Sequence, residues 1–115
     1  MTIAFSGRQT ISTTSYSLTT SSTTLAAQTT SGIVQLVLGL KNMVAGDAYR
    51  LQIFEKVLSD SVQYAAHSVT YSGAQSTPNV IIPAAYLSIG WDFTLTRLAG
   101  TDRVIEWSIR QVAVT

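Results

Sequence analysis

Apolar and polar residues alternate along much of the chain, most clearly between residues 88 and 112. The apolar positions there are Ile89, Trp91, Phe93 and Leu95, followed by Ile105, Trp107 and Ile109. A period of two places successive side chains on opposite faces of a strand, so each run predicts a strand with one buried face. The two runs flank a Gly-containing turn sequence at 99–102, and this arrangement predicts a β-hairpin that contains both tryptophans.

Other segments predict further strands. Residues 32–40 carry apolar side chains on both faces, as expected for a strand that is covered on both sides. Residues 49–53 alternate after a loop at 41–47, and we expect them to pair antiparallel with 32–40. Residues 62–71 change phase midway, which indicates a β-bulge or a strand exposed on both faces.

The N-terminal third has a different composition. Ile3 and Phe5 alternate with small polar residues, and we interpret residues 1–11 as a short strand or arm. Residues 10–31 are dominated by Ser and Thr, which a disordered linker would explain. Thr favours strands, however, and Tyr16 and Leu18 alternate within the segment. We therefore expect it to form edge strands or to pack against a neighbouring chain.

The fold class follows from the number and spacing of these segments. A short strand is expected at 80–82 and one helical turn at 84–88, which gives seven or eight strands in a single domain spanning 1–115. Turn signals recur every eight to twelve residues, as in sandwiches and barrels of antiparallel strands. The sequence therefore predicts an all-β protein, an antiparallel β-sandwich of jelly-roll or similar Greek-key type.

Composition indicates how such a domain meets its surroundings. Charged residues make up 11% of the chain, whereas Ser and Thr fill 30 positions. An ordinary domain has about 25% charged residues, and a charged surface keeps soluble monomers apart. The net charge is +1 and the basic residues are scattered, so we expect no nucleic-acid partner. We also expect no membrane span, and synthesis in the cytoplasm because the first residues do not resemble a signal peptide.

Candidate chemistry is sparse. His67 is the single histidine and the chain has no cysteine. The acidic residues are Asp47, Glu55, Asp60, Asp92, Asp102 and Glu106. Three of them fall in predicted turns, and we expect Asp92 and Glu106 to form cross-strand pairs with Arg97, Arg103 or Arg110. We therefore predict a protein that is not an enzyme and has no catalytic residue, no metal and no cofactor. Five tyrosines leave a carbohydrate-binding face as the alternative.

Three segments carry a resemblance to known proteins: GDAYRLQIFEK at 46–56, YSGAQ with Pro78 at 71–78, and GWDFTL leading to AGTDR at 90–103. Together they resemble the small structural proteins of tailed-bacteriophage virions, over about two-thirds of the chain. The resemblance implies a capsid decoration (cement) protein located in the virion. It also implies a homotrimer that contacts the major capsid protein. The Ser/Thr-rich third has no counterpart in this pattern.

A strand at the edge of a sandwich can extend the sheet of a neighbour. We therefore expect the arm and the following strand to make subunit or shell contacts through Ile3, Phe5, Ile11, Tyr16 and Leu18. Deletion of residues 1–11 should then leave a folded domain that does not assemble. The alternative function is a carbohydrate-binding module or a tail or fibre adhesin that binds glycans. A small hydrolase based on His67 is the weakest alternative.

Overall fold

The computed structural model describes residues 2–113, except for the side chains of residues 83, 84 and 113. Within this range the chain forms strands and no helix. The eight strands are β1 (Thr2–Ile11), β2 (Tyr16–Ser17), β3 (Gly32–Gly39), β4 (Ala48–Glu55), β5 (Tyr64–Ser72), β6 (Asn79–Leu87), β7 (Asp92–Ala99) and β8 (Arg103–Ala113). The all-β prediction is confirmed.

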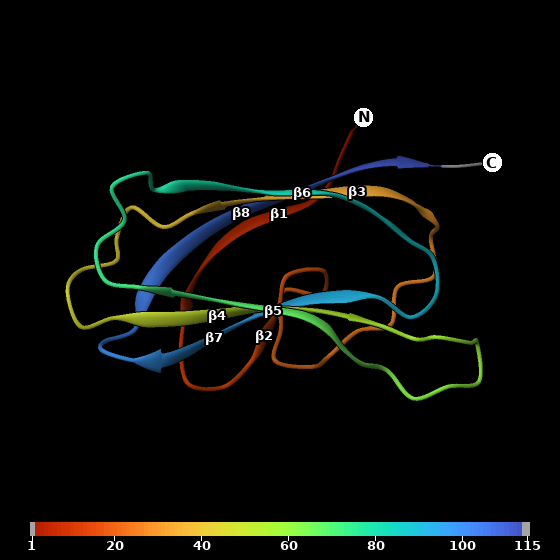
Figure 1. Cartoon of the computed structure of the whole chain (residues 1–115), viewed down its shortest axis with the longest axis horizontal. Helices are drawn as coiled ribbons and strands as arrows, with labels where there is room; N and C mark the ends of the chain where they lie inside the picture. The colour runs from red at the N-terminus through yellow and green to blue at the C-terminus, as the bar shows by residue number, and fades with distance from the viewer. Residues whose placement is uncertain (1, 114–115) are drawn as a thin grey trace.

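The strands form two antiparallel sheets that pack face to face as two layers (Figure 1). Sheet A has the order β1-β8-β3-β6, and sheet B has the order β2-β7-β4-β5. The first and last strands are neighbours in sheet A, where Thr2 pairs with Gln111. The two ends of the described chain therefore lie at the same end of the molecule.

This strand order is that of a jelly roll. The pairs β1–β8, β2–β7, β3–β6 and β4–β5 are those of one long hairpin, whose tip is the loop between β4 and β5. Rolling that hairpin up places alternate strand pairs in opposite sheets. The predicted antiparallel β-sandwich is thus confirmed, and the order of strands identifies its jelly-roll form.

The predicted hairpin at 88–112 is wrong. β7 pairs with β4 and β2 in sheet B, whereas β8 pairs with β1 and β3 in sheet A. Residues 100–102 therefore carry the chain across the core as an arch between the sheets. Both strands still bury their alternating apolar residues, because the inward faces of the two sheets meet in the core. Period two identifies the buried face of a strand but not the sheet to which it belongs.

Two smaller predictions are also wrong. β3 and β4 lie in different sheets and do not pair with each other. Residues 84–88 do not form a helical turn, because β6 continues to Leu87 as the antiparallel partner of β3. The bulge expected within 62–71 is confirmed, since the β4–β5 register shifts between Ile53 and Phe54.

Both sheets supply the core from their inward faces. Its buried apolar side chains come from six strands and the adjoining loops, and the largest of those fully buried are Trp91, Tyr49, Ile11, Leu18, Leu36, Leu38, Leu40, Leu51, Leu95, Ile105 and Ile109. Aromatic rings meet edge to face at two places. Trp91 contacts Phe5 and Phe93 with ring centroids 6.2 and 6.0 Å apart, and Tyr16 contacts Trp107 at 5.7 Å. Such pairs add to the stabilisation from burial.

The N-terminal arm is an integral strand of sheet A. β1 pairs with β8 from Thr2 to Ile11, with one register shift between Ile3 and Phe5. Its last residue, Ile11, is fully buried, and Phe5 packs against Trp91. Because deletion of residues 1–11 would remove these core contacts, we now expect it to destabilise the domain itself and not only its assembly.

Candidate functional site

The carboxylate of Asp92 organises the start of the Ser/Thr-rich segment. Asp92 is fully buried, and its Oδ1 accepts hydrogen bonds from Ser17 Oγ at 3.0 Å, Thr19 Oγ1 at 2.7 Å and Phe93 N at 2.8 Å. Its Oδ2 accepts one from Ala26 N at 2.8 Å. A buried carboxylate needs such compensation for lost hydration. The expected pairing of Asp92 with an arginine is wrong, because hydroxyl and amide donors take that place.

The rest of the segment is held by side chains from distant parts of the chain. Trp91 Nε1 donates to Thr30 O at 3.0 Å. Gln63 Nε2 donates to Ala26 O and to Gly90 O, both at 2.7 Å. Residues 18–30 therefore form an ordered cover beside β7, and the disordered-linker interpretation does not hold. The predicted edge strand is confirmed only at Tyr16–Ser17, where β2 pairs with β7 at the edge of sheet B, and packing against a neighbouring chain stays a prediction.

A second polar cluster fixes the arch between β7 and β8. The buried Asp47 carboxylate accepts hydrogen bonds from Val44 N at 3.0 Å, Thr101 N at 3.1 Å and Arg103 Nε at 2.9 Å. The bond from Val44 N, with those from Thr101 N and Arg103, holds the pKa of Asp47 below its usual value, against the opposing effect of burial. The Tyr49 hydroxyl donates to Thr101 O and accepts from Arg103 N, and burial raises its pKa. Both groups act here as structural anchors.

The other candidates for chemistry lie apart from one another. His67 is exposed on the edge strand β5, opposite Ile53. Glu106 pairs with Arg8 at 3.0 Å and with Lys41 at 3.6 Å. Within the described range, no three His, Cys, Asp or Glu residues come close enough to hold a metal ion.

Arginines of the last two strands pair differently from the sequence prediction. Arg97 pairs with Asp102 at 2.5 Å within the arch, and Arg103 pairs with Asp47. The partners predicted for them were Asp92 and Glu106, on the assumption that β7 and β8 are neighbours in one sheet. The strands lie in opposite sheets, and Arg97 and Arg103 have the inward parity of Leu95 and Ile105, so they meet the arch instead of the outward Asp92 and Glu106.

The tyrosines do not gather on one face. Tyr64 on β5 and Tyr86 on β6 are 70% and 57% exposed, but they belong to different sheets. Tyr49 is fully buried, whereas Tyr16 and Tyr71 are partly buried, and burial raises the pKa of Tyr71. A platform for stacking sugars would need at least two exposed rings side by side.

Only part of the predicted contact surface is accessible. Ile11 and Leu18 are 0% and 1% exposed because they belong to the core of this chain. Phe5 and Tyr16 are partly buried against Trp91 and Trp107. Ile3 is the exposed member of the set, at 61%. Alternation alone identified apolar residues but did not separate core positions from surface positions.

The outward face of sheet A carries more apolar residues than that of sheet B, although Gln35, Ser108 and Arg110 also lie on it. Strand alternation and register place polar residues on the outward face of sheet B, namely Arg50, Gln52, Ser68, Thr70, Thr94 and Thr96. On sheet A the outward positions include Ile33, Val37, Ile81, Tyr86 and Val112, which we call the apolar face. Four of these five are exposed, the exception being the partly buried Val37. The sequence signal for this face was the second set of apolar residues in 32–40.

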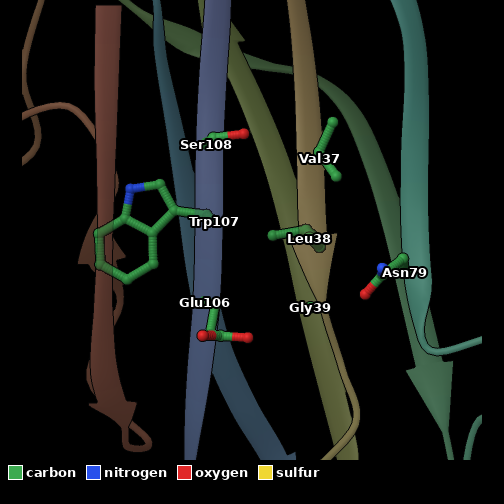
Figure 2. A pocket seen from close by; sticks show the side chains of 7 residues that line it. All are labelled: Val37, Leu38, Gly39, Asn79, Glu106, Trp107 and Ser108. Atoms are coloured by element: carbon green, nitrogen blue, oxygen red, sulfur yellow. The ribbon is translucent and has the colours of Figure 1, made fainter. Parts of the chain in front are cut away.

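A shallow hollow of about 200 Å³ adjoins the apolar face (Figure 2). Gly39 on β3 leaves space between Glu106 on β8 and Asn79 on β6, and Val37 and Ser108 border the hollow one row further along. Its walls offer one carboxylate, which already pairs with Arg8 and Lys41. The arrangement suits docking of a surface more than chemistry on a small molecule.

Comparison with known proteins gives no relatives: no family model, no curated protein and no solved structure matches the chain. Within the described residues, no helix has the length and hydropathy needed to cross a bilayer.

Proposed function

We propose that this chain is a non-enzymatic structural protein of a virion, a capsid decoration (cement) protein of a bacteriophage head. It acts by contacts with other copies of itself and with the major capsid protein, and it is located in the virion after assembly in the host cytoplasm. The observation that carries the proposal is the apolar face on sheet A. Contiguous exposed apolar surface on a small domain marks a site of association.

Three further features support the proposal. The jelly-roll fold recurs in viral capsid proteins, although a fold by itself does not fix function. The surface carries few charges, as expected of a protein whose surface is largely covered after assembly. The resemblance of residues 46–56, 71–78 and 90–103 to phage virion proteins points in the same direction.

The alternative, a carbohydrate-binding module or tail or fibre adhesin, has less support. Jelly rolls are also found in lectins. The exposed rings of Tyr64 and Tyr86 lie on different sheets, however, and the fully buried Tyr49 cannot contact a sugar. A glycan site would therefore have to use one isolated tyrosine.

The test is binding to phage heads. Purified protein is mixed with a panel of expanded tailed-phage heads that lack decoration protein, and the heads are pelleted. Saturable co-sedimentation and a higher temperature of head disruption are expected. Heads that already carry their own decoration protein are the matched control and should bind little.

Two results would contradict the proposal. One is the absence of saturable binding to every undecorated head in the panel. The other is binding to cell-surface glycans on an array, lost in Tyr64→Ala or Tyr86→Ala, without binding to heads. The second result would replace the proposal with the adhesin alternative.

A further inference from the structure

Apolar residues of the apolar face form continuous rows across neighbouring strands. Ile33 on β3 pairs with Val112 on β8 and with Tyr86 on β6. These three side chains are 40%, 38% and 57% exposed. Four residues further along, beyond a polar row in which Gln35 pairs with Arg110, Val37 on β3 pairs with Ile81 on β6, which is 60% exposed. Rows of this kind are typical of the inner face of a sheet that is packed on a second layer.

No described segment of this chain supplies that second layer. The inward face of sheet A packs on sheet B, and residues 18–30 cover β7 of sheet B through Asp92 and Trp91. The outward face of sheet B is therefore polar and partly covered by residues 18–30. The outward face of sheet A is more apolar, and no described segment covers it.

The size of sheet A indicates what could cover the apolar face. Four strands about 4.8 Å apart and eight residues long at about 3.3 Å each give roughly 500 Å² in projection, before side-chain relief is added. A stable protein interface buries about 800 Å² on each partner. The buried area therefore approaches that of a stable interface only if the partner covers the whole apolar face. A second sheet of the same dimensions would cover the whole face, whereas a single peptide strand would cover only part of it.

The arrangement of residues on β3 and β8 fits a second copy of the same sheet. A two-fold axis parallel to the strands, between β3 and β8, exchanges these strands across the contact. Their register then places Val112 against Ile33 of the second copy and Glu106 against Gly39 of the second copy. The carboxylate side chain would then face the hollow beside Gly39 of the second copy; Figure 2 shows this hollow in a single chain.

The same operation places no like charges directly opposite each other. Arg110 faces Gln35 of the second copy, and Arg8 on β1 faces Asn79 of the second copy on β6. A two-fold contact is self-complementary, so each of these contacts occurs twice. Charges opposite neutral residues cost less to bury than like charges placed together.

We infer that two copies of this chain associate through the apolar face, sheet A on sheet A, about a two-fold axis between β3 and β8. The sheets would lie about 10 Å apart, as in other stacked sheets. The inference rests on the proposed function, because it names the partner that covers the same face. It specifies a dimer, whereas the resemblance to decoration proteins implies a trimer.

The first test is the mass in solution. Light scattering from micromolar to millimolar concentration should show a species of twice the 12.4 kDa chain mass. Ile33→Lys introduces a charge on the central strand of sheet A and should raise the dimer dissociation constant at least tenfold. Gln52→Lys, on the central strand β4 of sheet B, is the matched control and should leave the constant unchanged. Circular dichroism and urea unfolding establish that both variants are folded.

The second test locates the axis. The chain has no cysteine, so Val37→Cys and Ser108→Cys each carry one thiol. Both positions lie on the strands next to the proposed axis, so each thiol comes about 11 Å from its equivalent in the second copy, too far for a disulfide. A short bismaleimide should therefore cross-link either variant to itself, whereas Ile81→Cys on β6, whose equivalent positions would be about 17 Å apart, should cross-link less.

Several outcomes would overturn the inference: a monomer at every concentration, a stable trimer, dissociation by Gln52→Lys but not by Ile33→Lys, or equal cross-linking of Val37→Cys and Ile81→Cys. Head binding is measured separately. A monomer that saturates undecorated heads would uphold the proposed function and overturn the dimer. A dimer that passes both tests but binds no heads would uphold the dimer and overturn the proposed function.

Discussion

Gly7 on β1 lies directly against the indole of Trp107 on β8, so that a Cβ placed on Gly7 would come within 2.9 Å of the ring carbon Cζ2. The indole is fixed in turn, because its Nε1 donates to Leu18 O at 3.1 Å and its ring packs against Tyr16. The close approach of β1 to the core therefore depends on the missing side chain.

Gly7→Ala is expected to lower the free energy of unfolding by about 1–3 kcal/mol, because the added methyl group overpacks a fixed ring. Urea unfolding followed by tryptophan fluorescence measures this change. Ser6→Ala, at the neighbouring exposed position, is the control and should stay within about 0.5 kcal/mol of the wild type. Equal stability of Gly7→Ala and wild type would show that β1 can move away from Trp107 without cost.

Asp92→Asn should destabilise the protein by about 2–3 kcal/mol, because an amide offers one acceptor oxygen where the carboxylate accepts four hydrogen bonds. Hydrogen exchange of amides in 18–30 should also become faster, since the segment loses its anchor. Asp102→Asn removes an exposed carboxylate that pairs with Arg97, and this control should cost less than about 1 kcal/mol. Unchanged exchange in 18–30 after Asp92→Asn would assign the order of the segment to other contacts.

The sequence and the structure agree on what depends on local pattern. Alternation located most of the strands, and their number and spacing gave the sandwich. The alternation of apolar and polar residues could not show that β7 and β8 face each other across the core, because a Gly-containing turn can either close a hairpin or cross between sheets. Nor could it place Asp92, whose partners Ser17 and Thr19 are more than 70 residues away in the chain. Such contacts depend on the rolled topology and leave no periodic signal.

The contact surface shows the same limit. Ile11 and Leu18 are apolar residues in a polar segment and were assigned to an interface, but the fold buries both. Ile33 and Val112 occupy outward positions in strands that were predicted correctly. Their exposure becomes visible only when the register places them beside Tyr86 on a face without a cover. To identify the contact surface, the type of each residue was therefore less informative than the identity of its neighbours on adjacent strands.

Acid should destabilise the arch through Asp47. Its folded-state pKa lies below the usual value for an Asp side chain, so the unfolded chain takes up a proton at a higher pH than the folded chain does. The stabilisation is therefore complete above the unfolded pKa and is lost as the pH falls through the folded pKa. The urea midpoint should fall steeply below about pH 4.

Asp47→Asn should flatten this acid limb, because the titrating group is gone. Asp60→Asn is the control, since it removes one negative charge from an exposed loop and leaves the bonds to Val44, Thr101 and Arg103 in place. The explanation fails if wild type and Asp47→Asn lose stability in parallel between pH 5 and pH 2, a range set by the carboxyl pKa values.

Gly100 and Gly73 provide a matched test of how the arch is closed. Both have positive φ angles, 86° and 74°, so an alanine at either position carries a backbone cost of about 1–2 kcal/mol. A Cβ on Gly73 would meet no atom within 4 Å, whereas a Cβ on Gly100 would overlap Asp47 Oδ1 and lie 2.7 Å from Asp47 Cα. Gly100→Ala must therefore displace the carboxylate that accepts the bonds from Thr101 and Arg103.

We expect Gly100→Ala to cost at least about 2 kcal/mol more than Gly73→Ala in urea unfolding, because overpacking and lost hydrogen bonds add to the same backbone strain. The excess should shrink in an Asp47→Ala background, where the overlapping oxygen is absent, and this coupling separates the contact from the strain. If the two alanine variants are equally stable, the arch is held by the strands that it joins, and the Asp47 cluster follows their positions without determining them.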